Sequence, residues 1–190
     1  MFAFKNYYYL YIENTKFLNL NLLKKRGKFI IIYRNKLNNE TFYDLNKFRK
    51  KCKEKSVLFF VANNRSLSIQ LNADGIYLSA HNKSFKHLNF HKFNKKIIGA
   101  AHNFKEIECK KKQGCETIIF SRLFKTDYIN KKTYLGVVRF NLLANRERND
   151  LVPLGGIRLN NLNYLKIVRT NSVAILSEIK KKPAISNRLF

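Results

Sequence analysis

The chain has 190 residues, with 38 Lys and Arg against 12 Asp and Glu, and its formal net charge is +26. This length suits a single domain over residues 1–190, although an eight-unit barrel usually needs about 200 residues or more. The three cysteines have no paired spacing, and no apolar run reaches the roughly 18 residues of a membrane span. The composition therefore argues against a disulfide framework, a cysteine zinc site and a membrane-spanning helix.

The first residues, MFAFKNYYYLYI, are aromatic and lack a small-residue cleavage site, which argues against a secretory signal. Free thiols and the missing signal predict a cytoplasmic protein. Lysines occur in nearly every segment between the apolar runs, so we expect the positive charge to be spread over solvated faces. A nucleic-acid partner is the alternative explanation of the charge, but no base-stacking motif accompanies it.

Eight short apolar runs follow one another along the chain, and most are continuous instead of alternating. They are rich in Ile, Val, Phe and Tyr, which is typical of strands covered on both faces in a parallel sheet. The expected strands cover residues 7–12, 28–34, 57–63, 75–80, 96–102, 117–124, 151–156 and 172–177.

Helix-compatible segments separate these runs. Asn103 can cap a helix that ends before Gly114. Regular alternation of strand and helix favours right-handed βαβ units, so the sequence predicts a single (β/α)8 TIM barrel with eight parallel strands and short helices. The expected helices cover residues 39–55, 66–72, 103–113 and 160–169, with less periodic segments at 15–26 and 84–92.

The last two runs end in residues suited to a phosphate. Gly155 and Gly156 carry no Cβ, so the backbone there can come close to an anion. Ser177 lies where a helix could begin, with free N–H groups and a hydroxyl. TIM barrels bind phosphate at the turns after strands seven and eight, so we expect an organic phosphate at this mouth.

The other strand ends are cationic, rich in amides and poor in carboxylates. Functional groups of such barrels lie at the carboxyl ends of the strands, and this set suits a phosphorylated ligand. The polar basic segment 125–133 is expected to form a loop over the mouth. The residues at these ends are Arg34, Lys36, Asn63, Asn64, His81, Asn82, His102, Arg122, Lys125, Lys131 and Lys132.

Histidine is the side chain whose unperturbed pKa lies near neutrality, so His102 is the expected general acid or base. Its alternative role is to cap the next helix or to satisfy backbone groups. His87 and His91 have the i, i+4 spacing of two metal ligands on one helical face, but no third ligand accompanies them. We therefore expect no metal site at these two histidines.

Several stretches together resemble the thiamine phosphate synthase family, which includes the thiazole tautomerase relatives (TenI-like proteins). They stand in the family's order and near its spacing. Family members are (β/α)8 barrels, in agreement with the strand count. The stretches are YRNK at 33–36, VANNRSLSIQLNADGIYLS at 61–79, KIIGAAHN at 96–103, KKKQGCETIIFSRLFKT at 110–126, PLGGI at 153–157 and VAILSEI at 173–179.

The resemblance implies an enzyme of thiamine biosynthesis. In the synthases a pyrimidine pyrophosphate ionises, pyrophosphate leaves with Mg2+ assistance, and the ring nitrogen of a thiazole phosphate captures the pyrimidine cation. By position, the resemblance assigns the pyrimidine pyrophosphate contacts to Arg34, Lys36 and Asn63, the thiazole-phosphate pocket to Gly156 and Ser177, and the flexible-loop Thr and Lys to Thr126 and to Lys131 or Lys132.

The sequence also departs from the family. The two Mg2+-binding aspartates fall on Asn64 and Asn82, whose neutral amides lose the charge that Mg2+ prefers. The tautomerase branch also lacks these acids, keeps a His at the position of His102 and retains the phosphate pocket. Other departures are Ile32 in place of a Gln, Ala101 in place of a pocket Ser, and Ser121-Arg122 in place of the Gly-Pro that opens the loop.

Three functions are therefore open: a synthase, a tautomerase that transfers a proton through His102, and a non-catalytic protein that binds a phosphorylated ligand. The expected ligand is a thiazole phosphate, with a pyrimidine pyrophosphate as the second substrate of a synthase. Mg2+ is expected from the family. The sequence also leaves open whether the protein forms a homo-oligomer.

Overall fold

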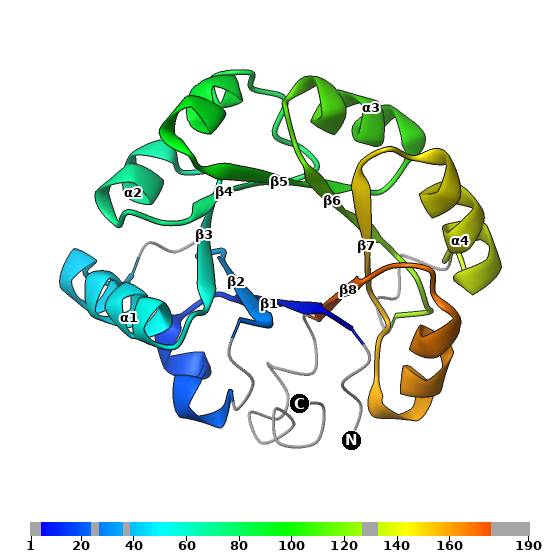
Figure 1. The fold of residues 1–190 in the computed structure, drawn as a ribbon, viewed down its shortest axis with the longest axis horizontal. Coiled ribbons are helices and arrows are strands. Elements are labelled where there is room, and N and C mark those ends of the chain that lie inside the picture. Colours follow the sequence, from blue (N-terminus) through cyan, green and yellow to red (C-terminus); the bar gives the residue numbers. More distant parts are fainter. Residues whose placement is uncertain (1–4, 24–26, 36–38, 127–132, 176–190) are drawn as a thin grey trace.

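Eight parallel strands close into a barrel in the computed structural model, which describes residues 5–23, 27–35, 39–126 and 133–175 (Figure 1). Each strand pairs with the next in the sequence, and the last pairs with the first. The predicted (β/α)8 fold is thus confirmed. The strands are β1 (Tyr7–Ile12), β2 (Phe29–Tyr33), β3 (Leu58–Ala62), β4 (Gly75–Leu78), β5 (Lys96–Ala101), β6 (Thr117–Ser121), β7 (Asp150–Leu154) and β8 (Ser172–Ile175).

The helices surround the ring of strands on its outside (Figure 1). Short 3-10 helices take the place of α-helices after β1, β4 and β7, which explains how a chain below the usual length closes a barrel. The α-helices are α1 (Phe42–Glu54), α2 (Arg65–Gln70), α3 (Phe104–Lys112) and α4 (Val137–Arg146), and the 3-10 helices are η1 (Thr15–Phe17), η2 (Leu20–Leu22), η3 (Leu88–Phe93) and η4 (Leu159–Ile167). Within the described residues, no helix has the length and apolarity to cross a membrane.

Polar caps fix where α1 and α3 begin. Thr41 accepts a hydrogen bond from the Asp44 N–H at 3.1 Å, and Asn103 accepts one from the Glu106 N–H at 2.9 Å. Each cap satisfies a backbone donor that the helix itself leaves unpaired. Asn103 thus begins α3 as the sequence predicts, and Gly114 follows its end with a φ of 74°.

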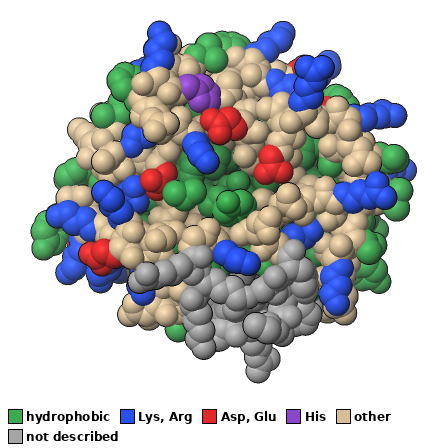
Figure 2. All heavy atoms as spheres, viewed as in Figure 1, with side chains coloured by type: hydrophobic (Ala, Val, Ile, Leu, Met, Phe, Trp, Pro, Cys, Tyr) green, Lys and Arg blue, Asp and Glu red, His purple; other side chains and the backbone are tan. Residues whose placement is uncertain are grey.

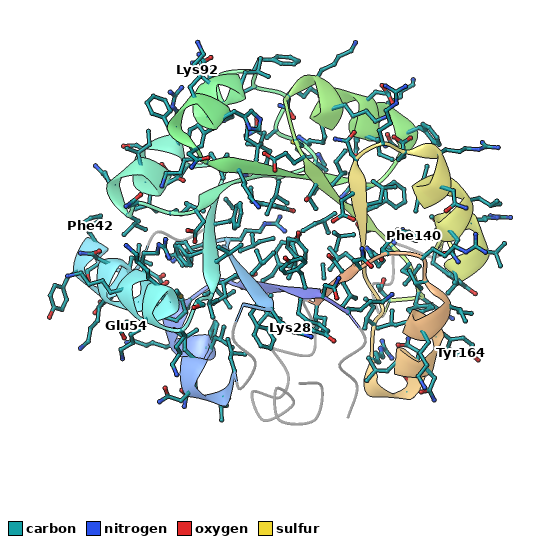
Figure 3. The ribbon with its side chains drawn as sticks, in the orientation of Figure 1. Lys28, Phe42, Glu54, Lys92, Phe140 and Tyr164 are labelled. Carbon is teal, nitrogen blue, oxygen red and sulfur yellow. The ribbon has the colours of Figure 1, made fainter. Side chains whose placement is uncertain are left out.

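The strands bury side chains on both faces, as their continuous apolar runs predict. Inside the barrel, one layer includes Tyr11, Ile32 and Tyr77. Outside it, alternate strand residues pack against the helices in a second, larger cluster that includes Phe140 of α4. Figure 3 shows Phe140 on the inner side of α4, whereas Tyr164 lies on the outer surface of η4.

Helix α4 is absent from the sequence prediction. Its inner face buries Phe140 and Leu143, but Val138 and Leu142 are exposed. Apolar residues thus surround the helix, and this distribution obscures the helical period. The expected helix 160–169 is also different, because the chain there forms the 3-10 helix η4.

A structural ion pair lies at the barrel end opposite the strand tips. Asp74 accepts a hydrogen bond from the Phe59 N–H at 2.7 Å and pairs with Arg49 of α1 at 2.9 Å. Because Asp74 precedes β4, these bonds fix α1 against β3 and β4 at the amino end. The carboxyl ends of the strands remain for the candidate site.

Candidate functional site

The closed parallel barrel brings the carboxyl ends of all its strands to one mouth. Arg34 follows β2, Asn63 follows β3, His102 follows β5 and Gly156 lies just past β7. The topology therefore brings together predicted site residues that lie far apart in sequence. Lys36, Lys131, Lys132 and Ser177 lie outside the described residues.

Amide and hydroxyl groups form a network at the tips of β3 and β4. The Ser79 N–H donates to Asn63 Oδ1 at 3.0 Å, and Asn63 Nδ2 donates to Ser79 Oγ at 3.1 Å. Asn82 Nδ2 donates to the same Asn63 Oδ1 at 3.0 Å. The two predicted residues Asn63 and Asn82 are thus in direct contact, and Ser79 links them.

The positions expected to hold Mg2+ fit a metal ion poorly. Asn64 Oδ1 caps α2 by accepting from the Leu67 N–H at 3.0 Å, and Asn82 Oδ1 accepts from the Ser84 N–H at 2.9 Å. Both amide oxygens are neutral and already hydrogen-bonded, whereas Mg2+ sites in proteins usually include one or two carboxylates. Among the described residues, no three His, Cys, Asp or Glu side chains cluster as metal ligands.

His102 contacts a hydroxyl at the tip of the neighbouring strand. Its Nδ1 lies 2.6 Å from Ser121 Oγ, a normal distance for a hydrogen bond that involves a hydroxyl. The His102 N–H donates to Glu106 Oε2 at 2.6 Å, while Asn103 caps the helix. The helix cap is thus provided by Asn103, and the His102 backbone N–H contacts Glu106.

Two tyrosines lie inside the barrel near Arg34. The rings of Tyr11 and Tyr77 meet edge to face with centroids 5.5 Å apart. Burial raises the pKa of Tyr11 well above its usual value and also raises the pKa of Tyr77, while the Arg34 guanidinium acts against both shifts. The Tyr77 hydroxyl is near enough to influence Tyr11, although the two hydroxyls do not meet the geometry of a normal hydrogen bond.

In the turn after β7, two glycines leave the backbone uncovered by side chains, as the sequence predicts. Gly155 and Gly156 both have positive φ, at 102° and 68°. A Cβ on Gly156 would lie 2.6 Å from the Phe124 carbonyl oxygen, so only glycine fits there. Within the described residues, neither glycine N–H is a donor in any hydrogen bond, so both are available to an anion.

Thr126 follows the point where the loop after β6 passes close to the β7 turn. The chain before it contacts the β7 turn, because the Phe124 N–H donates to the Gly155 carbonyl at 3.0 Å. The Thr126 hydroxyl oxygen is buried and has no hydrogen-bond partner among the described residues. The structure thus places this loop threonine in the chain segment that borders the β7 glycines.

Within the described residues, His87 and His91 do not meet as paired ligands. His91 Nε2 lies 2.9 Å from the Gly114 carbonyl oxygen, and its Nδ1 lies 3.2 Å from Glu116 Oε1. Because η3 is a 3-10 helix, the i, i+4 spacing of His87 and His91 does not place them on one face. Figure 2 shows Lys and Arg side chains distributed around one whole face of the barrel and not gathered in a single patch.

Sequence reasoning did not assign a role to four polar residues at or below the mouth, although it named Ser121 as a departure from the family: Ser79, Ser121, Tyr11 and Tyr77. Ser121 was hidden because the expected strand 117–124 runs past it, whereas β6 ends at Ser121 itself. Both tyrosines lie within apolar runs of the sequence. The alternation of strand side chains could have placed Tyr11 and Tyr77 inside the barrel.

Comparisons with known proteins point to one family. The family model described as Thiamine monophosphate synthase matches residues 14–179. A thiamine-phosphate synthase from Prochlorococcus marinus (strain AS9601) is 31% identical over 129 residues, which are 67% of this chain and 37% of that protein. One from Fusobacterium nucleatum is 27% identical over 148 residues, or 75% of this chain and 72% of that protein.

Solved structures show the same fold. The thiamine phosphate pyrophosphorylase from Pyrococcus furiosus superposes with a TM-score of 0.77 at 16% identity, over 98% of this chain and 94% of that one. The YdjI aldolase from Escherichia coli K12 has a TM-score of 0.68 at 10% identity, over 92% and 76%. The chain spans less than half the length of the Prochlorococcus relatives it matches. Since the family model covers most of the sequence, the chain belongs to the thiamine monophosphate synthase family.

Proposed function

We propose that this chain binds a thiazole phosphate at the carboxyl ends of β7 and β8 and acts on it in thiamine biosynthesis. The observation that carries the proposal is the β7 turn, where Gly155 and Gly156 offer two unused N–H groups. Backbone N–H groups and the absence of a Cβ suit a phosphate oxygen. Ser177 is proposed as the partner from the β8 side, and Thr126, Lys125 and Lys131 as groups from the loop.

The chemistry that this mouth favours is proton transfer through His102. A tautomerase has to move a proton between positions of the thiazole ring, and one histidine can remove it and return it. The bond between His102 and Ser121 supports this role, because a hydroxyl on Nδ1 fixes the orientation of the ring.

The coupling reaction of the family is the second candidate, and family membership supports it. Arg34 is proposed to bind the pyrophosphate of the pyrimidine substrate, together with Lys36 and Asn63. The Arg34 guanidinium has no hydrogen bond or ion pair within the described part of the chain, so it is available for this role. The amides at Asn64 and Asn82 argue against efficient Mg2+-assisted departure of pyrophosphate.

Calorimetry with the phosphate of hydroxyethylthiazole tests the binding step. We expect binding by the wild-type protein and weaker binding by Gly156→Ala. No heat of binding at millimolar ligand would contradict the proposal. Thiamine phosphate formation and thiazole isomerisation are then assayed separately, each with Mg2+ and with EDTA.

The two assays separate the candidate activities. Isomerisation that persists in EDTA and is lost in His102→Asn would support proton transfer. Thiamine phosphate formation that requires Mg2+ would support the coupling reaction instead. Ligand binding without either activity would identify a non-catalytic binding protein.

A further inference from the structure

We infer that Asn63, Ser79 and Asn82 form a subsite that binds a phosphate or pyrophosphate group directly, without a metal ion. The inference rests on the function proposed above, since it concerns another wall of the same mouth. It differs from what the family resemblance implies for Asn82, which takes the position of a Mg2+-binding aspartate. We call these three residues the amide subsite.

Backbone donors fix the orientation of both amides. The Ser79 N–H points at Asn63 Oδ1 at 3.0 Å, and the Ser84 N–H points at Asn82 Oδ1 at 2.9 Å. A backbone N–H can only donate, so the atom that faces it has to be the amide oxygen. The usual ambiguity between the oxygen and the nitrogen of an asparagine is therefore removed at both residues.

A count of donors and acceptors shows what the subsite offers to a ligand. Asn63 Oδ1 already accepts two hydrogen bonds, from Ser79 and Asn82, and Asn82 Oδ1 accepts one. Each amide nitrogen has two hydrogens, and each donates only one of them within the described residues. The second N–H of each amide and the Ser79 O–H therefore remain to donate to a ligand.

The subsite keeps unused donors, whereas most of its oxygen lone pairs are occupied. Such a surface binds hydrogen-bond acceptors, of which phosphate oxygens are the strongest in this ligand class. A cation would need the oxygens instead. Asn63 is exposed, and Ser79 and Asn82 are partly exposed, so a ligand can reach all three.

A buried cation supports the subsite from below. Lys110 Nζ donates to the Asn82 carbonyl at 2.6 Å and to Gln113 Oε1 at 2.8 Å, and neither side chain is exposed. Gln113 Nε2 donates to the carbonyls of Asn82 and Ser84 at 3.0 and 2.8 Å. These bonds hold the loop after β4, and with it the Asn82 amide, in place.

The stem of Lys110 is fixed against β5. A Cβ on Gly99 would lie 2.9 Å from Lys110 Cγ and Cδ, so the lysine lies directly on the strand backbone. No salt bridge to Lys110 occurs in the described part of the chain, which leaves its positive charge unpaired by a carboxylate. A positive charge behind the subsite favours an anion in front of it.

Calorimetry with inorganic pyrophosphate tests the inference, first in EDTA and then with Mg2+. We expect the wild-type protein to bind pyrophosphate in EDTA. Asn82→Ala should weaken this binding by roughly tenfold or more, the effect of losing a hydrogen bond to a charged group. Asn163→Ala, on an exposed residue of η4, is the matched control and should bind like the wild type.

A second variant tests the metal dependence. Asn64→Asp combined with Asn82→Asp adds two carboxylates, and aspartate caps a helix as well as asparagine does. This double variant should lose pyrophosphate binding in EDTA and recover part of it with Mg2+. Ser79→Ala, expected to weaken binding severalfold, replaces Asn82→Ala if thermal melting shows that the latter is unfolded.

The inference is overturned if the wild-type protein does not bind pyrophosphate in EDTA, whether or not Mg2+ restores binding, or if Asn82→Ala and Asn163→Ala show equal losses. Binding by the double variant in EDTA at wild-type strength would overturn it as well. The β7 turn is tested separately, because Gly156→Ala should weaken thiazole phosphate binding and leave pyrophosphate binding intact. Failure of the proposed function and failure of the amide subsite are thus distinguishable.

Discussion

Ser121 Oγ and His102 Nδ1 lie 2.6 Å apart, although the two residues are separated by 19 positions in the chain. The register of the barrel explains the contact. Ala101 of β5 lies opposite Phe120 of β6. The residues that follow them, His102 and Ser121, are therefore neighbours as well. The hydroxyl is therefore placed by the strand pairing and not by a loop, which makes it a rigid partner for the imidazole.

Ser121→Ala removes this partner from His102. We expect the rate of any His102-dependent isomerisation to fall by about five- to tenfold, which corresponds to one net hydrogen bond of about 1 kcal/mol. The environment of the imidazole should also change, since Nδ1 loses its hydrogen-bond partner. Nitrogen chemical shifts of His102, followed over pH in the ligand-free protein, measure this change.

The matched control for Ser121→Ala is Ser66→Ala, on an exposed residue of α2. It removes a hydroxyl far from His102 and should leave both the rate and the His102 shifts unchanged. Unchanged His102 shifts in Ser121→Ala would show that the hydroxyl does not position the ring.

The β7 turn should not tolerate a side chain at Gly156. Alanine there would adopt a φ of 68° and bring its Cβ within 2.6 Å of the Phe124 carbonyl oxygen. We expect Gly156→Ala to lower the free energy of unfolding by more than about 1 kcal/mol. Urea denaturation of the wild type and the variant measures the loss.

Gly27→Ala separates steric overlap from backbone strain. Gly27 has nearly the same φ, 72°, but a Cβ there would have no atom of the described residues within 4 Å. The free energy of unfolding of this variant should fall only by the smaller cost of placing alanine in the left-handed backbone conformation. Equal losses in the two glycine variants would show that the crossing of the β6 and β7 loops is not tightly packed.

Periodicity and composition were enough to predict the barrel. Continuous apolar runs define strands buried on both faces, and eight successive βαβ units that end in two phosphate-type turns favour a closed parallel barrel. This order also placed Arg34, Asn63, Asn82 and His102 at one mouth. Asn103 and Gly114 marked the ends of α3 because capping depends on local chemistry.

Contacts between side chains at the mouth could not be predicted in the same way. The bond between His102 and Ser121 depends on where β6 ends, and the apolar run continued beyond that point. The orientation of the Asn63 and Asn82 amides depends on backbone donors from a loop without periodic pattern. The burial of Lys110 was also missed, since a run of three lysines is typical of a solvated helix face.

The three thiols should differ in reactivity. Burial raises the pKa of Cys52 and of Cys115 to about 12, while Cys109 is partly exposed on α3. The thiolate is the reactive form, so a thiol reagent at pH 8 should modify Cys109 rapidly and the other two only after unfolding. Mass spectrometry of the labelled peptides identifies the site, and rapid labelling of Cys52 in the native protein would contradict its burial.

Lys110 should give the protein a distinctive pH dependence. Burial lowers the pKa of its ammonium in the folded state below the usual 10.5. Between that lowered pKa and 10.5 the unfolded chain binds more protons, so the free energy of unfolding rises with pH in this window. Lys110→Met lacks the titration, and the stability of the wild type relative to this variant should therefore increase as the pH rises toward 10.5.

Comparison of the two proteins isolates the lysine from other groups. Burial raises the pKa of Tyr9 to about 12, so alkaline pH destabilises the folded state through this phenol, but it does so in both proteins alike. Denaturant titrations from pH 7 to 10 should show a difference in slope of at most about 1.4 kcal/mol per pH unit, the effect of one proton. Lys112→Met, on an exposed residue of the same helix, should show no such difference, and a wild-type slope equal to that of Lys110→Met would mean that the Lys110 pKa is not lowered by folding.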